Sequence, residues 1–137
     1  MSNKLTIQAT VAADSQKAWD YYTQPKHITQ WNFADPSWHC PSASNNLRVG
    51  GKYTARMEAK DGSFGFDFEA VYSAIEPGES FAYTLGDGRQ VSVTFEQQTE
   101  HTLVTVVFDP ESENPMEMQR NGWQAILDNY AKYTEAH

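Results

Sequence analysis

A Trp-His-Cys run at residues 38–40 holds the side chains of this sequence that could most directly do chemistry. A cysteine nucleophile needs a general base within hydrogen-bond reach and a third group that orients the base. Neighbours in an extended segment point to opposite faces, so His39 and Cys40 are poorly placed to activate each other. We interpret Cys40 as a small buried apolar residue. We place His39 at the mouth of a pocket, where a polar group could orient a bound molecule.

Other titratable residues give no stronger catalytic signal. The remaining histidines are His27, His101 and His137. They lie in separate predicted elements, which does not provide the ligand spacing of a metal site. Asp67 and Glu69 share a strand face and could act as an acid–base pair. Their parity is opposite to that of Phe66 and Phe68, which favours a solvated outer face. We therefore predict no catalytic residue, no metal and no cofactor.

Length, charge and cysteine content limit the classes of function. The 137 residues fit a single domain, and the formal net charge is −8. Lysine and arginine are scattered without a basic stripe, so we expect no nucleic-acid partner. The single cysteine allows no internal disulfide, which fits a reducing compartment. No apolar run reaches the length of a membrane span, and no signal peptide is recognised. We expect a cytoplasmic protein.

The first 46 residues predict a strand, two short helices and a loop. Apolar and polar residues alternate over 5–11, which predicts a half-buried strand. Asp14 supplies the N-cap of a short helix, and Pro25 either ends this helix or begins a second one. Two prolines and several Ser and Asn residues predict a loop over 32–46.

The rest of the chain predicts a strand meander and one long helix. Residues 47–108 alternate in short runs that are typical of antiparallel strands with one dry face. The turns between them are expected at Asp61-Gly62, Glu76-Pro77-Gly78 and Asp87-Gly88. Asn114 is the expected cap of an amphipathic helix that reaches Tyr133 and has about five turns. A curved sheet with one dry face needs a cover, and only this helix can supply it. The predicted fold is therefore α+β, with six to seven strands.

Large apolar side chains occupy the positions predicted to face the interior. From the sheet these are Tyr53, Met57, Phe66, Phe68 and Tyr83, and from the helix Met116, Trp123, Ile126 and Leu127. Trp31, Phe33 and Trp38 would close the space from the other side, with His39 at its mouth. Such a set either packs as a solid core or leaves a void for a small ligand. We predict that these thirteen residues bind the ligand if the void exists.

Five segments carry a resemblance to a known family. They are KAWDYYT (17–23), WNF to WHCP (31–41), LRVGGKY (47–53), MEAKDG (57–62) and GWQAILDNY (122–130). With the order of the elements, they resemble the bacterial branch of the activator of heat-shock-protein-90 ATPase family, in its C-terminal-type domain. This branch belongs to the START and Bet v 1-like (SRPBCC) superfamily. The resemblance implies a helix-grip fold, in which a curved sheet wraps a long C-terminal helix around a cavity used for lipids, hormones and polyketides.

Three functions are compatible with these observations. The first is a non-catalytic binding domain for an unidentified small hydrophobic or amphipathic ligand. The second, implied by the resemblance, is a co-chaperone that stimulates a heat-shock-protein-90-type ATPase, although the eukaryotic members use an additional N-terminal domain for which these residues have no room. The third is a cyclase- or hydrolase-like enzyme that uses His39 with Tyr or Asp residues in the cavity, and it requires polar groups that converge on one substrate atom.

Overall fold

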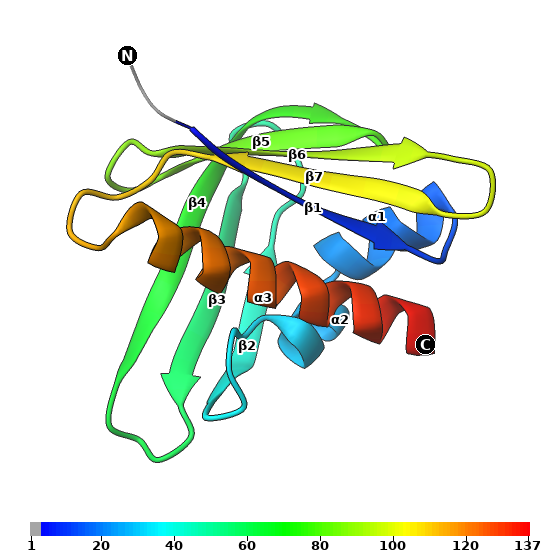
Figure 1. Ribbon diagram of the computed structural model, residues 1–137. Helices are drawn as coiled ribbons and strands as arrows, with labels where there is room; N and C mark the ends of the chain where they lie inside the picture. The colour runs from blue at the N-terminus through cyan, green and yellow to red at the C-terminus, as the bar shows by residue number, and fades with distance from the viewer. Residues whose placement is uncertain (1–3) are drawn as a thin grey trace.

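Seven antiparallel strands wrap around one long helix in the computed structural model, which describes residues 4–137 (Figure 1). The elements are β1 (Leu5–Val11), α1 (Ser15–Thr23), α2 (Pro25–Trp31), β2 (Trp38–Asn45), β3 (Lys52–Ala59), β4 (Gly65–Glu76), β5 (Ser80–Leu85), β6 (Gln90–Gln97), β7 (Thr102–Phe108) and α3 (Met116–Ala136). The seven strands form one sheet in the order β1-β7-β6-β5-β4-β3-β2. The predicted α+β helix-grip fold, with two short helices after the first strand, is confirmed.

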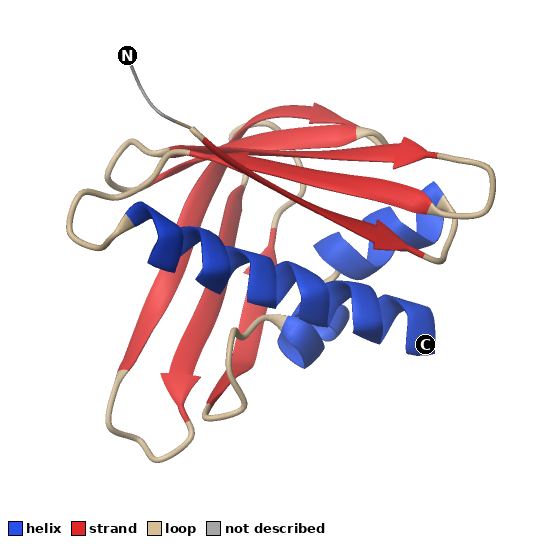
Figure 2. Ribbon diagram, viewed as in Figure 1, coloured by secondary structure: helices blue, strands red, loops and turns tan. Residues whose placement is uncertain are grey.

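The sheet is strongly curved, and β4 carries the bend. This strand pairs with β3 through its first half and with β5 through its second half, with a register shift between Tyr72 and Ala74. Figure 2 shows β1, β5, β6 and β7 as one wall and β2, β3 and the start of β4 as a second wall, with α3 running across the space between them. The shift lets one long strand belong to both walls.

Glycines at the predicted turns have the backbone conformation that tight hairpins require. Gly62 and Gly88 have φ angles of 78° and 94°, in the left-handed region that side chains disfavour. Gly78 follows with a φ of 78° in the turn between β4 and β5. All three predicted turns are confirmed.

Two of the three helices begin at the residues that the sequence indicates. The Asp14 carboxylate caps α1 by accepting a hydrogen bond from the Lys17 amide at 2.8 Å. Pro25 is the first residue of α2, where its missing amide hydrogen is not needed. It therefore begins the second helix, which decides between the two alternatives left by the sequence.

The start of α3 differs from the prediction. The helix begins at Met116, and Pro115 occupies the cap position without a side-chain hydrogen bond. The Gln119 side chain holds the preceding loop instead. It donates to the carbonyl of Asn114 at 2.8 Å and accepts from the Glu111 amide at 2.8 Å. The prediction of Asn114 as the cap is therefore wrong.

The predicted loop over 32–46 contains a strand. β2 lies at the edge of the sheet and pairs only with β3. The register shifts between His39 and Ser42, around Pro41. Proline lacks the amide hydrogen of a strand ladder, but an edge position next to a bulge tolerates this loss. Proline and serine content alone thus misidentified the segment, and only residues 32–37 and Asn46 lie outside the strand.

The core lies on the concave face of the sheet, and the ion pairs between β3 and β4 lie on the convex face. Tyr130 of α3 is fully buried, and its hydroxyl donates to the carbonyl of Ala18 at 2.6 Å. On the other face, Arg56 pairs with Asp67 at 3.4 Å, and Glu69 pairs with a lysine. The prediction of a solvated outer face for these two carboxylates is confirmed. Of the helices in residues 4–137, none combines the length and apolar character that crossing a membrane requires.

Candidate ligand cavity

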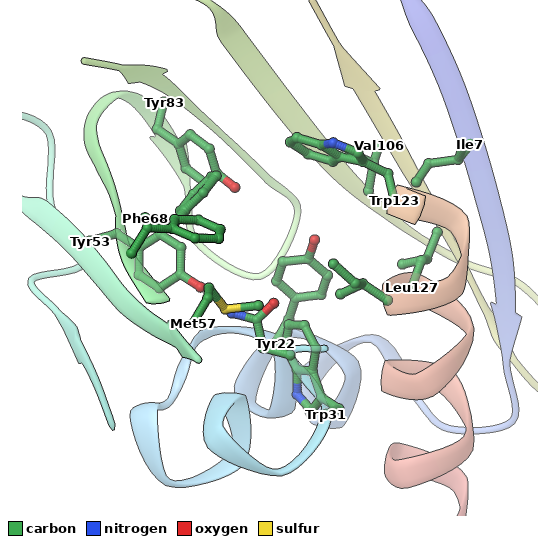
Figure 3. A pocket seen from close by; sticks show the side chains of 13 residues that line it. Ile7, Tyr22, Trp31, Tyr53, Met57, Phe68, Tyr83, Val106, Trp123 and Leu127 are labelled. Atoms are coloured by element: carbon green, nitrogen blue, oxygen red, sulfur yellow. The ribbon is translucent and has the colours of Figure 1, made fainter. Parts of the chain in front are cut away.

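A cavity of about 190 Å³ lies between the concave face of the sheet and α3 (Figure 3). Its wall consists of Ile7, Tyr22, Trp31, Asn32, Tyr53, Met57, Phe66, Phe68, Tyr83, Val106, Trp123, Ile126 and Leu127. An apolar cavity of roughly 150 Å³ admits benzene. The space beneath α3 therefore suits a molecule of one or two rings, and the interior is not packed solid throughout.

Nine of the residues predicted from the sequence lie in this wall. They are Trp31, Tyr53, Met57, Phe66, Phe68, Tyr83, Trp123, Ile126 and Leu127. The strand residues share one parity, and the helix residues share the face of α3 that turns toward the sheet. The alternation along the strands and the periodicity of the helix thus identified residues that belong to five elements and meet at one cavity. Their contact with a ligand remains a prediction.

Phe33, Trp38, His39 and Met116 lie outside the cavity wall. The His39 side chain is 42% exposed and approaches the Glu58 carboxylate at 3.6 Å on the outer face of the sheet. Met116 lies exposed in the first turn of α3. Trp38 packs against Phe66, which belongs to the wall, and against its neighbour Phe64, without lining the cavity itself. Phe33 contributes its backbone carbonyl, which accepts a hydrogen bond from an α3 side chain.

Cys40 occupies the inward position that His39 does not. It is only 2% exposed, so its interpretation as a small buried residue is confirmed. Burial raises the pKa of its thiol, and this effect exceeds the opposing hydrogen bonds from Asn32 and with the carbonyl of Ser42. The opposite orientation of the two neighbours follows from the alternation of an extended segment. Within residues 4–137 its hydrogen-bond partners are Asn32 and the carbonyl of Ser42, neither of which is the base that a nucleophile would need.

Four residues of the wall were missed by sequence reasoning: Ile7, Tyr22, Asn32 and Val106. Ile7 and Val106 face each other across β1 and β7, and their apolar alternation identified them only as core. Tyr22 lies on the inner face of α1. Asn32 follows α2 and is buried, although its segment has the composition of a loop. No local signal distinguishes a residue beside a void from one in packed core.

Aromatic side chains form most of the wall and support one another. The indole of Trp123 stacks on the ring of Phe108, with centroids 4.0 Å apart and planes within 7°. Phe68 makes edge-on contacts with Tyr53 and Tyr83, with ring centroids 5.9 and 6.1 Å apart. Such pairs favour defined ring orientations. Phe66 is 42% exposed, so the wall reaches solvent at this position.

Besides the indole N–H groups of Trp31 and Trp123, the polar groups of the wall come from Tyr22, Tyr53, Tyr83 and Asn32. Burial raises the pKa of all three tyrosine hydroxyls well above its usual value of about 10, so they stay protonated at neutral pH. Among the described residues, none of the thirteen in the wall is a carboxylate, a histidine or a lysine. The cavity is thus uncharged, with hydrogen-bonding groups that neither accept nor release protons near pH 7.

The acid–base chemistry that the sequence left open needs His39 beside the tyrosines of the cavity, and the structure does not bring them together. His39, the residue assigned to that role, lies on the outer face of the sheet. Within residues 4–137, no three His, Cys, Asp or Glu side chains gather closely enough to hold a metal ion. The cavity is therefore lined by apolar and uncharged hydrogen-bonding groups, with His39 outside it.

The sequence and the fold are similar to those of known proteins. Residues 12–135 match the family model described as Activator of Hsp90 ATPase homolog 1-like protein. The solution structure of an AHSA1-like protein from Aeromonas hydrophila is 36% identical with a TM-score of 0.92, covering 98% of this chain and 93% of that chain. A protein from Cytophaga hutchinsonii is 45% identical with a TM-score of 0.84, covering 97% and 92%. A protein from Chromobacterium violaceum, 20% identical with a TM-score of 0.86 and 97% of each chain covered, shares the fold. No curated protein matches the chain.

Proposed function

Because this chain belongs to the Activator of Hsp90 ATPase homolog 1-like family, we propose that it is a binding domain that holds a small, uncharged, mainly apolar molecule between the sheet and α3. The cavity of about 190 Å³ carries this proposal. Open space in a core forfeits packing contacts, so a molecule that fills it stabilises the fold. The aromatic pairs of the wall support this proposal by placing large rings around the space.

The character of the wall limits the ligand. An ionised group inside an uncharged cavity would lose its hydration without gaining a partner. A charged ligand would therefore have to keep its head group at Phe66, where the wall reaches solvent. A neutral molecule could enter completely. We accordingly favour neutral one- and two-ring compounds over long fatty acids.

An NMR titration tests this proposal. ¹⁵N-labelled protein is titrated with tetralin and 1-tetralone, two bicyclic compounds of nearly the same shape, and the amide shifts are mapped. We expect at least one compound to shift amides from Ile7, Tyr53 and Leu127, which belong to separate parts of the wall. Absence of any shift in the wall at millimolar concentration of both compounds would refute the proposal.

Two variants of α3 provide a matched pair for this titration. Ile126→Trp adds bulk to the cavity wall, whereas Met118→Trp adds it to an exposed position on the same helix. Overpacking destabilises a folded core by about 1–3 kcal/mol, so the Ile126 variant should first be shown to stay folded. We expect it to lose binding, while the Met118 variant binds like the parent protein.

The family description supports a second candidate, stimulation of an Hsp90-type ATPase. This function would use the surface of the domain rather than its cavity. The turnover of such a chaperone, measured with saturating amounts of this protein, separates the two candidates. Unchanged turnover eliminates the second one. Stimulation that persists in Ile126→Trp would show that it does not depend on the cavity.

A further inference from the structure

Three tyrosines of the cavity wall differ from other tyrosines in what their hydroxyls contact. Tyr72 donates to the side-chain oxygen of Asn45 at 2.8 Å, and Tyr130 donates to a backbone carbonyl at 2.6 Å. The hydroxyls of Tyr22, Tyr53 and Tyr83 have no hydrogen-bond partner within residues 4–137, although Tyr53 and Tyr83 are only 8% and 6% exposed. The protein thus leaves unpaired those hydroxyls that belong to the cavity wall.

The three unpaired hydroxyls border space that a small molecule can reach. Among residues 4–137, no fully buried side-chain nitrogen or oxygen lacks a partner, so an unpaired hydroxyl must border a space that a small molecule can reach. Figure 3 shows the hydroxyl oxygens of Tyr22, Tyr53 and Tyr83 turned toward the space between the sheet and α3. They come from α1, β3 and β5, three elements far apart in the sequence. The fold therefore gathers three donors around one volume.

Asn32 adds a side-chain amide to the same wall. Its amide nitrogen lies 3.9 Å from the sulfur of Cys40, which is a weak acceptor. Its side-chain oxygen has no partner among the described residues. The wall therefore offers an acceptor beside the three donors, so it can also satisfy a ligand hydroxyl.

The chemistry of these groups identifies a ligand class. A hydrocarbon that filled the cavity would separate the hydroxyls from water and give them nothing in exchange, which is unfavourable for any buried polar group. A ligand with acceptor oxygens at these points would satisfy them. Sites built to hydrogen-bond a polar group discriminate strongly against analogues that lack it. The uncharged wall excludes carboxylates and amines from the same position.

We propose that Tyr22, Tyr53 and Tyr83 form a polar recognition set that selects neutral molecules bearing a ketone, ester or hydroxyl oxygen over hydrocarbons of the same shape. This inference rests on the proposed binding function. It makes the tyrosines specificity-determining residues that contact the ligand. The apolar remainder of the wall supplies affinity without this distinction.

Tetralin and 1-tetralone test the selection directly, because they differ in one carbonyl oxygen. Tetralin leaves water more readily, so the informative quantity is the affinity ratio of the two compounds compared between variants. The triple variant Tyr22→Phe/Tyr53→Phe/Tyr83→Phe removes only the hydroxyls. We expect its preference for 1-tetralone over tetralin to be at least tenfold smaller than that of the parent protein. Tyr72→Phe is the control, since its hydroxyl is paired outside the wall, and it should keep the parent ratio.

Each outcome separates this inference from the proposed function. If both compounds bind and the ratio changes by less than threefold in the triple variant, the recognition set is refuted while cavity binding stands. If neither compound binds the parent protein, the proposed function fails and the inference fails with it. Should the triple variant not fold, Tyr53→Phe and Tyr83→Phe alone must each reduce the ratio, and an unchanged ratio in both contradicts the inference.

Discussion

The indole of Trp123 lies parallel to the ring of Phe108, with centroids 4.0 Å apart, and this stack joins α3 to β7 at the wall of the cavity. Phe108 is fully buried, whereas Trp123 is half-buried and lines the cavity. The contact therefore serves both the packing of the helix and the shape of the space beneath it. Removing it should change stability and ligand size together.

We expect Trp123→Ala to destabilise the fold by about 3 kcal/mol, near the lower end of the range for buried aromatic residues, because the residue is only half-buried. The larger cavity should then accept ligands with one more ring than the parent protein does. Urea denaturation measures the first effect, and an NMR titration with anthrone measures the second. Met118→Ala, an exposed change on the same helix, should leave ligand size unchanged. A stable Trp123→Ala variant with unaltered binding would contradict this role.

Paired and unpaired tyrosine hydroxyls should respond differently to removal. Tyr130→Phe eliminates a buried hydrogen bond to the carbonyl of Ala18 and should cost about 1–2 kcal/mol in the free energy of unfolding. Tyr83→Phe eliminates a hydroxyl without a partner among the described residues and should cost nothing or stabilise slightly. Denaturation in the absence of ligand compares the two. Equal losses would indicate that the Tyr83 hydroxyl has a structural role.

Stability should fall as the pH is lowered through the range in which histidine titrates. The imidazole of His27 stacks on the ring of Tyr21, with ring centroids 3.8 Å apart. Its Nδ1 atom lies 2.8 Å from the Tyr133 hydroxyl. Burial, followed by the charge of Lys26, lowers the pKa of His27 in the folded state. The unfolded chain therefore binds a proton first, below about pH 6.5, and folding loses stability from there downward.

Urea denaturation at pH 7.5 and 5.5 measures the contribution of His27. We expect His27→Gln to reduce the difference in unfolding free energy between the two pH values. Gln30→Ala, an exposed change on the same helix, should keep the difference of the parent protein. A pH dependence that is unchanged in His27→Gln would assign the effect to other groups.

Cys40 should react slowly with thiol reagents while the protein is folded. The side chain is almost fully buried, and burial raises its thiol pKa, so little thiolate is available. Modification by a disulfide reagent at pH 7.5, with and without denaturant, gives the comparison. We expect the folded protein to react at least a hundredfold more slowly, at the rate of its opening. Rapid modification of the native state would argue for a reactive thiol.

Much of the fold could be predicted because its signals are local. Gly62 and Gly88 mark turns by a conformation that other residues avoid, and Asp14 caps its helix with its own side chain. β2 escaped prediction because Pro41 is unfavourable in a strand unless the strand lies at an edge beside a bulge. Whether a strand lies at an edge depends on the whole sheet, so no local sequence pattern predicts it.

The cavity was predicted only in part, for a related reason. Alternation placed Tyr53 and Phe68 on the inner face, and the helix period did the same for Leu127. Neither pattern distinguishes a wall residue from packed core, so Tyr22 was missed. Met116 was included because it continues the apolar stripe of α3, but its turn lies at the exposed end of the helix. Such differences depend on where elements end in space.

The location of a bound ligand tests the central claim most directly. Nuclear Overhauser effects can be measured between the protons of 1-tetralone and methyl groups of a ¹³C-methyl-labelled sample. The cavity predicts contacts with the methyl groups of Ile7, Val106, Ile126 and Leu127. Contacts with the exposed methyl groups of Leu47, Val49 and Val71 instead would place the ligand on the surface and contradict a binding site between the sheet and α3.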